Sequence, residues 1–345
     1  MSQAPALIET RALSVDVPAT RFAFPKPRPL SILAGVSLAI RAGEIVCMVG
    51  ESGSGKTTFG RALLGLVKPS AGQILLDGTP LPDFSDRSFR SVRGQASLLF
   101  QDPLSSFNPR QRIGAMIAEP RRIAGSGPTR MEDIAALARQ AGLPERFLSR
   151  FPHALSGGQA RRAAVARALS VVPRLIVADE PTAGLDVSIQ GGVLNLFLDI
   201  RERHGTAFLM ITHNLSVVRH IADRIVILYL GRMVESGPAA DILHAPGHPY
   251  TEALLKAEPI PDPGQRRAAP PVLGEVPSIA ARPPGCEFHT RCPLAQPRCR
   301  REAPDFDGSP GGHRVACHFP LPAPRSAFAS LRNSKLQQQP EGRRS

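Results

Sequence analysis

Short apolar runs, rich in β-branched side chains, recur along the chain and predict its buried strands. The strand candidates are residues 44–49, 98–100, 175–180 and 207–212. The strongest helical patterns are in residues 58–66, 130–142 and 160–170. These patterns predict a strand-rich first hundred residues, a helical stretch over 102–165, and alternating strands and helices over 166–245. Such an order is typical of an α/β fold.

The first buried strand leads directly into a glycine-rich loop, GESGSGKTT, that fits the pattern G-x-x-x-x-G-K-[ST]. Placed between a strand and a helix, this loop turns backbone N–H groups toward an anion, and the helix adds its positive end. Lys56 is predicted to reach the outer phosphates of a nucleotide, and the Thr57 hydroxyl to hold Mg²⁺. The loop residues expected to bind the nucleotide are Gly50, Glu51, Ser52, Gly53, Ser54, Gly55, Lys56, Thr57 and Thr58.

Polar side chains at the ends of the other strands supply the remaining parts of a hydrolytic site. Asp179 can hold Mg²⁺, and the adjacent Glu180 can orient or deprotonate an attacking water. His213 can contact the outermost phosphate, and the amide of Gln101 can bind Mg²⁺ or the water. Taken alone, the acid pair is also compatible with a solvated strand end, and His213 with a structural histidine. Beside a phosphate loop, we expect Lys56, Gln101, Glu180 and His213 to be catalytic.

In the order and spacing of these motifs, about 250 residues of the chain resemble an ATP-binding cassette (ABC) subunit. The matching segments are Gly50–Thr58 (Walker A), Gln101 (Q-loop), Leu155–Gln159 (LSGGQ signature), Leu175–Asp179 with Glu180 as general base (Walker B), Ala183–Asp186 (D-loop) and His213 (switch histidine). Gly184 is a mild departure from the usual D-loop. The resemblance implies a P-loop NTPase with a RecA-like core, an N-terminal antiparallel β-subdomain and a helical subdomain.

The signature segment precedes a strongly helical Ala/Arg stretch, and so forms a second glycine-rich helix start that carries a hydroxyl. Such a start suits a terminal phosphate, although an ordinary capped helix has the same pattern. The family resemblance implies that two cassettes pair head to tail and enclose two ATP molecules. Each signature then meets the nucleotide held by the opposing cassette. The residues implied are Ser156, Gly157, Gly158, Gln159 and Asp186.

The adenine needs a stacking surface, which the family supplies from an aromatic residue on an early strand. Phe24 is our first candidate and Phe22 the second. Either ring is also compatible with a place in the core.

The chain divides into three regions by composition. We predict an ABC ATPase domain over 1–257 with its helical subdomain over 102–165, and a proline-rich extension over 258–319. Residues 320–345 are rich in Pro, Ser, Gln and Arg, and we predict a disordered tail. No internal repeat is visible, which indicates one cassette and not two.

Four of the five cysteines crowd into the extension, at Cys286, Cys292, Cys299 and Cys317. Thiols this dense in a segment with little core suggest a metal staple. A [4Fe–4S] cluster tolerates such varied spacing, whereas the absence of C-x-x-C pairs weakens a zinc site. Free thiols are the third alternative. The remaining cysteine, Cys47, fits a small core residue.

The extension also indicates which group of ABC subunits the chain resembles. The segments HPYTEAL (248–254), PIP (259–261) and GC…RCP (285–293) are similar to the C-terminal extension of oligopeptide, dipeptide and nickel importers. The resemblance implies a peptide importer with a second, paralogous cassette, two membrane permeases and an extracytoplasmic solute-binding protein. Nickel-chelate and glutathione importers share the same cassette, so the sequence leaves the substrate open.

Composition sets the remaining limits. No apolar run reaches the ~18 residues of a membrane helix, and the N-terminus lacks a signal-peptide pattern, so we expect a peripheral protein on the cytoplasmic face of the inner membrane. The net charge of +13 is compatible with binding to nucleic acid or to anionic lipid, and also with the amino-acid usage of a GC-rich genome. No basic run stands beside aromatics, and no nucleic-acid partner is expected. The rival functions are a non-transport ABC ATPase acting on nucleic acid and a redox-sensing binding module.

Overall fold

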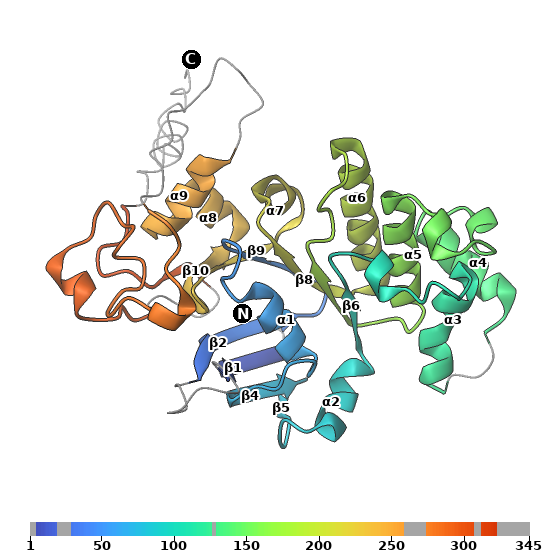
Figure 1. Cartoon of the computed structure of the whole chain (residues 1–345), viewed down its shortest axis with the longest axis horizontal. Coiled ribbons are helices and arrows are strands. Elements are labelled where there is room, and N and C mark those ends of the chain that lie inside the picture. The colour runs from blue at the N-terminus through green and yellow to red at the C-terminus, as the bar shows by residue number, and fades with distance from the viewer. Residues whose placement is uncertain (1–4, 19–28, 126–128, 259–273, 307–311, 323–345) are drawn as a thin grey trace, which may run out of the picture.

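A computed structural model describes residues 5–18, 29–125, 129–258, 274–306 and 312–322. The chain forms a central sheet with a smaller antiparallel sheet beside it (Figure 1). A group of helices lies at one end of the molecule and the cysteine-bearing region at the other (Figure 1). The mixed α/β architecture that the sequence predicts is confirmed.

The central sheet has the strand order β11-β10-β9-β3-β8-β7-β6. Its strands are β3 (Ile45–Val49), β6 (Ala96–Leu99), β7 (Leu175–Asp179), β8 (Ala207–Thr212), β9 (Arg224–Tyr229), β10 (Arg232–Pro238) and β11 (Arg314–Val315). The five strands from β9 to β6 pair in parallel, whereas β10 and β11 add antiparallel pairs at one edge. Parallel strands place their carboxyl ends at the same edge, so the loops that follow β3, β7 and β8 converge.

Strands β3, β7 and β8 are buried at every position, as their uninterrupted apolar runs predict. The side chains of β3 alternate between two cores. Ile45, Cys47 and Val49 pack in one cluster with the large helices, and Val46 and Met48 pack in another with the small sheet and α1. Cys47 is therefore the core residue that the sequence predicts.

The smaller sheet has the order β2-β1-β4-β5 and is antiparallel throughout. Its strands are β1 (Ala6–Val17), β2 (Leu30–Arg41), β4 (Ala71–Leu76) and β5 (Thr79–Pro80). The inward side chains Leu13, Val15 and Leu33 are fully buried against α1 and the central sheet. This is the antiparallel subdomain that the family resemblance implies.

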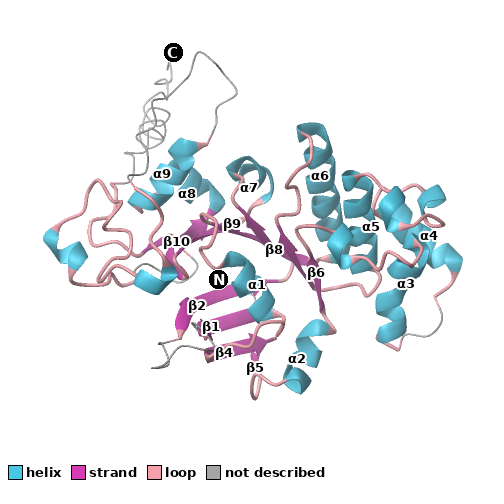
Figure 2. Ribbon diagram, in the orientation of Figure 1, coloured by secondary structure: helices cyan, strands magenta, loops and turns pink. Residues whose placement is uncertain are grey.

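Helices cover both faces of the central sheet (Figure 2). They are α1 (Lys56–Leu63), α2 (Asp86–Arg93), α3 (Ile113–Ile123), α4 (Met131–Gln140), α5 (Gly157–Leu169), α6 (Val187–His204), α7 (Leu215–Ile221), α8 (Ala239–His244) and α9 (Pro249–Ala257). Short 3₁₀ turns are η1 (Leu104–Ser106), η2 (Glu145–Phe147), η3 (Pro152–Ala154), η5 (Ile279–Ala281) and η6 (Pro297–Arg300). Helices α3, α4 and α5 pack together; α3 and α4 lie within the predicted helical stretch 102–165, whereas α5 continues to Leu169. In the part of the chain that is described, no helix is long and apolar enough to cross a membrane.

The domain boundaries at 257 and 319 stay predictions. Most of the predicted proline-rich linker and of the 320–345 tail lies outside the described residues. The described part of the extension is not a separate body, because Phe288 is 1% exposed and packs in the main core cluster.

Candidate functional site

The glycine-rich loop joins the end of β3 to the start of α1, and two of its glycines are required by their surroundings. A Cβ at Gly50 would lie 2.2 Å from the carbonyl oxygen of Leu228. Gly55 caps α1 with φ +97°, and a Cβ there would lie 2.9 Å from the Leu33 side chain. The loop therefore takes a path that only glycine permits at these points.

Lys56 lies under this loop and is 7% exposed. Its ammonium donates hydrogen bonds to the carbonyl oxygens of Gly50 (2.7 Å) and Glu51 (2.8 Å) and to the Ser54 hydroxyl (3.2 Å). Burial lowers the pKa of Lys56, and the carboxylates of Glu180, Asp179 and Glu51 act in the opposite direction. The loop thus holds a positive charge beside its inward-turned backbone.

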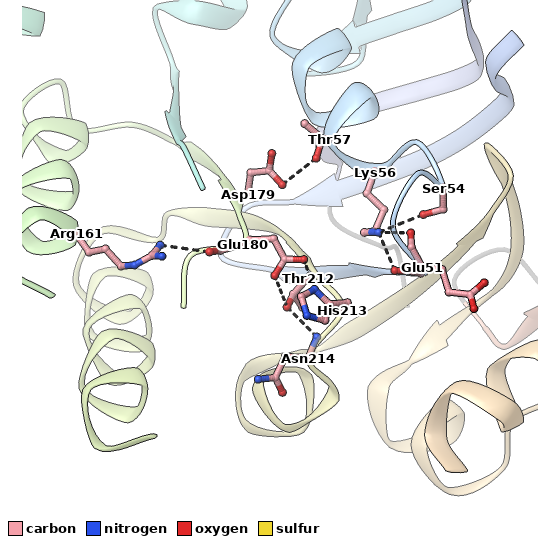
Figure 3. A network of polar contacts seen from close by, with 11 residues as sticks. Glu51, Ser54, Lys56, Thr57, Arg161, Asp179, Glu180, Thr212, His213 and Asn214 are labelled. Carbon is pink, nitrogen blue, oxygen red and sulfur yellow. Dashed lines mark hydrogen bonds and ion pairs between the residues drawn. The ribbon is translucent and has the colours of Figure 1, made fainter. Parts of the chain in front are cut away.

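The carboxylate of Asp179, at the end of β7, accepts a hydrogen bond from the Thr57 hydroxyl at 3.0 Å (Figure 3). Burial raises the pKa of Asp179, and the hydrogen bond from Thr57 partly opposes this effect. A hydroxyl beside a carboxylate is a hard-oxygen pair of the kind that Mg²⁺ prefers. The two residues predicted from separate motifs to hold Mg²⁺ are in direct contact.

Glu180 follows Asp179 and turns toward the end of β8 (Figure 3). One carboxylate oxygen lies 2.6 Å from Nδ1 of His213, and the other accepts a hydrogen bond from the Thr212 hydroxyl at 3.3 Å. The backbone of Glu180 has φ +47°, a left-handed conformation that costs free energy in a non-glycine residue. Its N–H donates to the carbonyl of Ile211 at 2.8 Å, and its carbonyl accepts from Arg161 at 3.3 Å. Both backbone contacts fix the carboxylate next to His213.

These groups share one open cleft of about 1160 Å³. It is lined by all nine predicted loop residues (50–58) together with Gln101, Asp179, Glu180 and His213. The cleft is also lined by residues from β2, α9 and η5, including Ile32, Leu254 and Ile279. The structure therefore gathers the predicted catalytic and phosphate-binding residues in a space large enough for a nucleotide.

The signature residues do not line this cleft, although they are well ordered by local contacts. Ser156 caps α5 and forms a reciprocal capping box with Gln159, as an ordinary helix start would. Ser156 and Gly157 are nevertheless exposed, and so is Asp186 at the start of α6. The side chain of Ile189 lies against Gly158, so the signature and D-loop regions form one surface.

Phe24, the expected adenine-stacking residue, and its alternative Phe22 lie outside the described residues. Several groups at the site were missed by the sequence analysis. Thr212 and Arg161 contact Glu180 directly, and their signals were their positions just before His213 and just after the signature.

The four extension cysteines, Cys286, Cys292, Cys299 and Cys317, do converge, since all of them line one small apolar pocket. Burial raises the pKa of Cys286 to about 11, and it also raises the pKa of Cys292 and Cys317. Among the described residues, however, no group of three or more His, Cys, Asp or Glu side chains is placed to hold a metal ion. The donor set suits an iron–sulfur cluster or zinc, but its placement gives that expectation no support.

Comparison with known proteins agrees with this geometry. Residues 33–183 match the ABC transporter family profile, and residues 234–299 match the oligopeptide/dipeptide transporter C-terminal region. The chain is 42% identical to a di/tripeptide transport ATP-binding protein, DppF, of Pseudomonas aeruginosa over 90% of this chain and 97% of that protein. It is 43% identical to the oligopeptide transport ATP-binding protein OppF of Escherichia coli over 84% of this chain and 88% of that protein.

Solved structures show the same fold. The chain is similar to the dimeric structure of the ATP-binding cassette MJ0796 in a post-hydrolysis state with ADP and Pi, with TM-score 0.60 and 26% identity. A second dimeric structure of MJ0796, described as a bacterial ABC transporter cassette, gives TM-score 0.61 and 27% identity. Each comparison covers 67% of this chain and 98% of the solved one.

Proposed function

Because the chain belongs to the ABC transporter family, as an ATP-hydrolysing subunit of peptide importers, we propose that it couples ATP hydrolysis in the β3–β7–β8 cleft to peptide uptake. The observation that carries the proposal is the contact of Glu180 with His213, in the same cleft as Lys56, Thr57 and Asp179. The carboxylate proposed as the general base thereby lies in the same cleft as Lys56, which would hold the outer phosphates.

We assign the roles as follows. Lys56 and the loop N–H groups bind the phosphates. Thr57, Asp179 and Gln101 would hold Mg²⁺, which would neutralise charge on the phosphate oxygens. Glu180 accepts a proton from the attacking water as the new oxygen–phosphorus bond forms and the bond to ADP breaks. His213 and Thr212 hold the Glu180 carboxylate in place, and His213 also reaches the outermost phosphate. These roles are supported by the contacts of the side chains with one another.

We propose that a second cassette completes the site, and that this partner is a paralogous subunit. The exposed Ser156–Gly157 start of α5 supports this, because it is available to a nucleotide bound elsewhere. The apolar side chains of Val187 (84% exposed) and Ile189 (37% exposed) flank the same surface and favour a protein contact there. Asp186 would lie within that contact.

A peptide importer ATPase works with membrane permeases, and we propose two of them, with an extracytoplasmic solute-binding protein and a peripheral place at the cytoplasmic face. The relatives named for peptide transport support peptides over nickel chelates or glutathione. The same relatives favour a role in transport over a role as a nucleic-acid ATPase or as a redox-sensing module.

Replacing Glu180 by Gln tests the proposal. The amide keeps the shape of the side chain but cannot take the proton, so the turnover rate of the assembled importer should fall by about 10²–10⁴-fold. The affinity of Glu180→Gln for ATP should stay at the wild-type level. Lys56→Ala, by contrast, should lose both ATP binding and turnover. An unchanged turnover rate in Glu180→Gln would exclude Glu180 as the base.

The cysteine pocket carries a separate proposal, that its four thiols bind an iron–sulfur cluster or, alternatively, zinc. The convergence of the thiols on one pocket supports it. Within the described residues, however, no three of these side chains are placed as ligands of one metal ion. Iron, acid-labile sulfide and zinc, measured per chain after anaerobic purification, decide the matter, and a colourless protein without either metal would leave four free thiols.

A further inference from the structure

Glu51, the second residue of the phosphate loop, is held from the far end of the chain. Its carboxylate accepts two hydrogen bonds from Arg291, one from Nη1 at 2.6 Å and one from Nη2 at 2.8 Å. This is the bidentate geometry that makes Arg–carboxylate pairs strong and directional. The Arg291 side chain is only 5% exposed and that of Glu51 26%, so water screens the pair less than a surface pair. The cysteine-bearing extension thus reaches directly into the loop that binds phosphate.

An aromatic cluster fixes both partners of this pair. The guanidinium of Arg291 lies 5.9 Å from the ring centre of Tyr229 and 6.0 Å from that of Phe288. The Tyr250 ring packs on both of these rings, with centres 4.7 and 5.3 Å away. The Tyr250 hydroxyl in turn accepts the backbone N–H of Glu51 at 2.9 Å. Glu51 is therefore held through its side chain and through its backbone by the C-terminal part of the chain.

A carboxylate in a phosphate loop has a clear electrostatic cost. It repels a triphosphate, and it attracts Lys56, whose ammonium already contacts the Glu51 carbonyl. Arg291 cancels the charge of Glu51 and keeps the carboxylate turned away from Lys56. The hydrogen bonds that Arg291 donates to Glu51 raise the pKa of Arg291, so this residue stays cationic at any physiological pH.

We propose that Arg291 is a positioning residue of the nucleotide site, which sets the affinity for ATP by neutralising and orienting Glu51. The inference rests on ATP binding at the phosphate loop. The proposed role of Arg291 differs from a merely structural one, in which the Arg291–Glu51 pair only anchors the cysteine-bearing extension. A structural role predicts that losing Arg291 lowers stability whatever stands at position 51. The proposed role predicts that removing the charge of Glu51 rescues ATP binding.

The test is a double-mutant cycle on the full chain. The variants are Arg291→Met, Glu51→Gln and the double variant, with ATP affinity measured by titration in the presence of Mg²⁺. The matched control is Arg298→Met, which breaks an ion pair of the same extension with both side chains more than half exposed. Lys56→Ala checks the phosphate loop itself. The KM for ATP and kcat are measured in the assembled importer, and melting temperatures are recorded for every variant.

We expect Arg291→Met to weaken ATP binding by about tenfold, the size of effect that one uncompensated charge nearby produces. Its kcat at saturating ATP should stay at the wild-type level. Adding Glu51→Gln should bring the affinity to within about threefold of wild type, although the melting temperature stays low. Arg298→Met should change neither quantity. If Arg291→Met binds ATP as tightly as wild type, or if the double variant binds as weakly as Arg291→Met, the proposal is wrong.

A second variant keeps the test decisive should Arg291→Met fail to fold. Arg291→Lys keeps the charge and loses the two-pronged contact, and it should bind ATP within about threefold of wild type. A loss in Arg291→Lys of tenfold or more would show that packing, and not charge, is what matters. If wild type itself fails to bind ATP, the proposed function fails. If wild type binds ATP and Lys56→Ala does not, unchanged ATP binding in Arg291→Met excludes the positioning role of Arg291 but leaves the proposed function intact.

Discussion

A buried histidine at the start of α9 should make the stability of the protein depend on pH. His248 is 1% exposed, and its Nδ1 accepts the backbone N–H of Tyr250 at 3.0 Å, which caps the helix. The backbone N–H of His248 donates to the carboxylate of Glu235, a residue with no exposed surface. Burial lowers the pKa of His248 to about 3. The folded protein therefore keeps this imidazole neutral where the unfolded chain protonates it.

The sign and size of the effect follow from proton linkage. Below the ordinary histidine pKa of about 6.5, the unfolded chain binds one proton more than the folded chain, so the free energy of unfolding falls as the pH falls. The slope from one such group is about 1.4 kcal/mol per pH unit, or about 2 kcal/mol between pH 6.5 and pH 5. Above pH 7 the group contributes no slope. The loss continues until the pH reaches the folded pKa.

Asparagine at position 248 separates titration from capping, because its side chain can cap a helix but does not titrate. Urea unfolding from pH 5 to pH 7.5 can be followed by tyrosine fluorescence. The chain has no tryptophan, and its two tyrosines, Tyr229 and Tyr250, are in ring contact beside this site. His248→Asn should be less stable at pH 7.5, yet its stability should fall less steeply below pH 6.5. Equal slopes in the two proteins would refute the reasoning.

Three further substitutions test other parts of the molecule. Gly65→Ala should destabilise the protein by about 1–3 kcal/mol more than Gly78→Ala. Both glycines have positive φ, but only at position 65 would a Cβ lie 2.2–2.6 Å from atoms of the Phe89 ring. Equal melting temperatures for the two variants would contradict this expectation. His213→Ala should lower kcat at saturating ATP by about 10²-fold, and a wild-type kcat would exclude a role for His213 in positioning Glu180. Asp179→Asn should raise the Mg²⁺ concentration for half-maximal hydrolysis by about tenfold, whereas an unchanged Mg²⁺ titration would exclude Asp179 as a ligand.

The parts of the site that the sequence predicted are those encoded by local pattern. Strands β3, β7 and β8 are largely continuous apolar runs. Of the candidate site residues, Asp179 ends β7, His213 follows β8 directly, and Lys56 lies on the helix that follows β3. In a parallel sheet those ends meet at one edge, so local motifs were enough to bring the groups into one cleft.

The parts that were missed depend on packing between distant segments. The contacts of Glu51 with Tyr250 and Arg291 join residues 199 and 240 positions apart, and no periodicity encodes them. Arg161 was likewise hidden, because its role depends on how α5 meets the turn after β7. The positive φ of Glu180 is also a product of tertiary contacts.

The cysteine cluster lies between these two cases. The crowding of Cys286, Cys292, Cys299 and Cys317 predicted a metal site, and the structure brings the four residues to the lining of one pocket. Spacing does not determine the direction of each side chain, however, and within the described residues no group is placed for a metal. The metal expectation therefore went further than the pattern alone could justify.

The proposed function requires that the cleft around Lys56 bind ATP. Calorimetric titration of ATP into the purified chain with Mg²⁺ measures this binding, with Lys56→Ala as the matched control. We expect saturable binding of one ATP per chain in the wild type and its loss in Lys56→Ala. If the wild type does not bind ATP, or if Lys56→Ala binds it equally tightly, the cleft is not the ATP site.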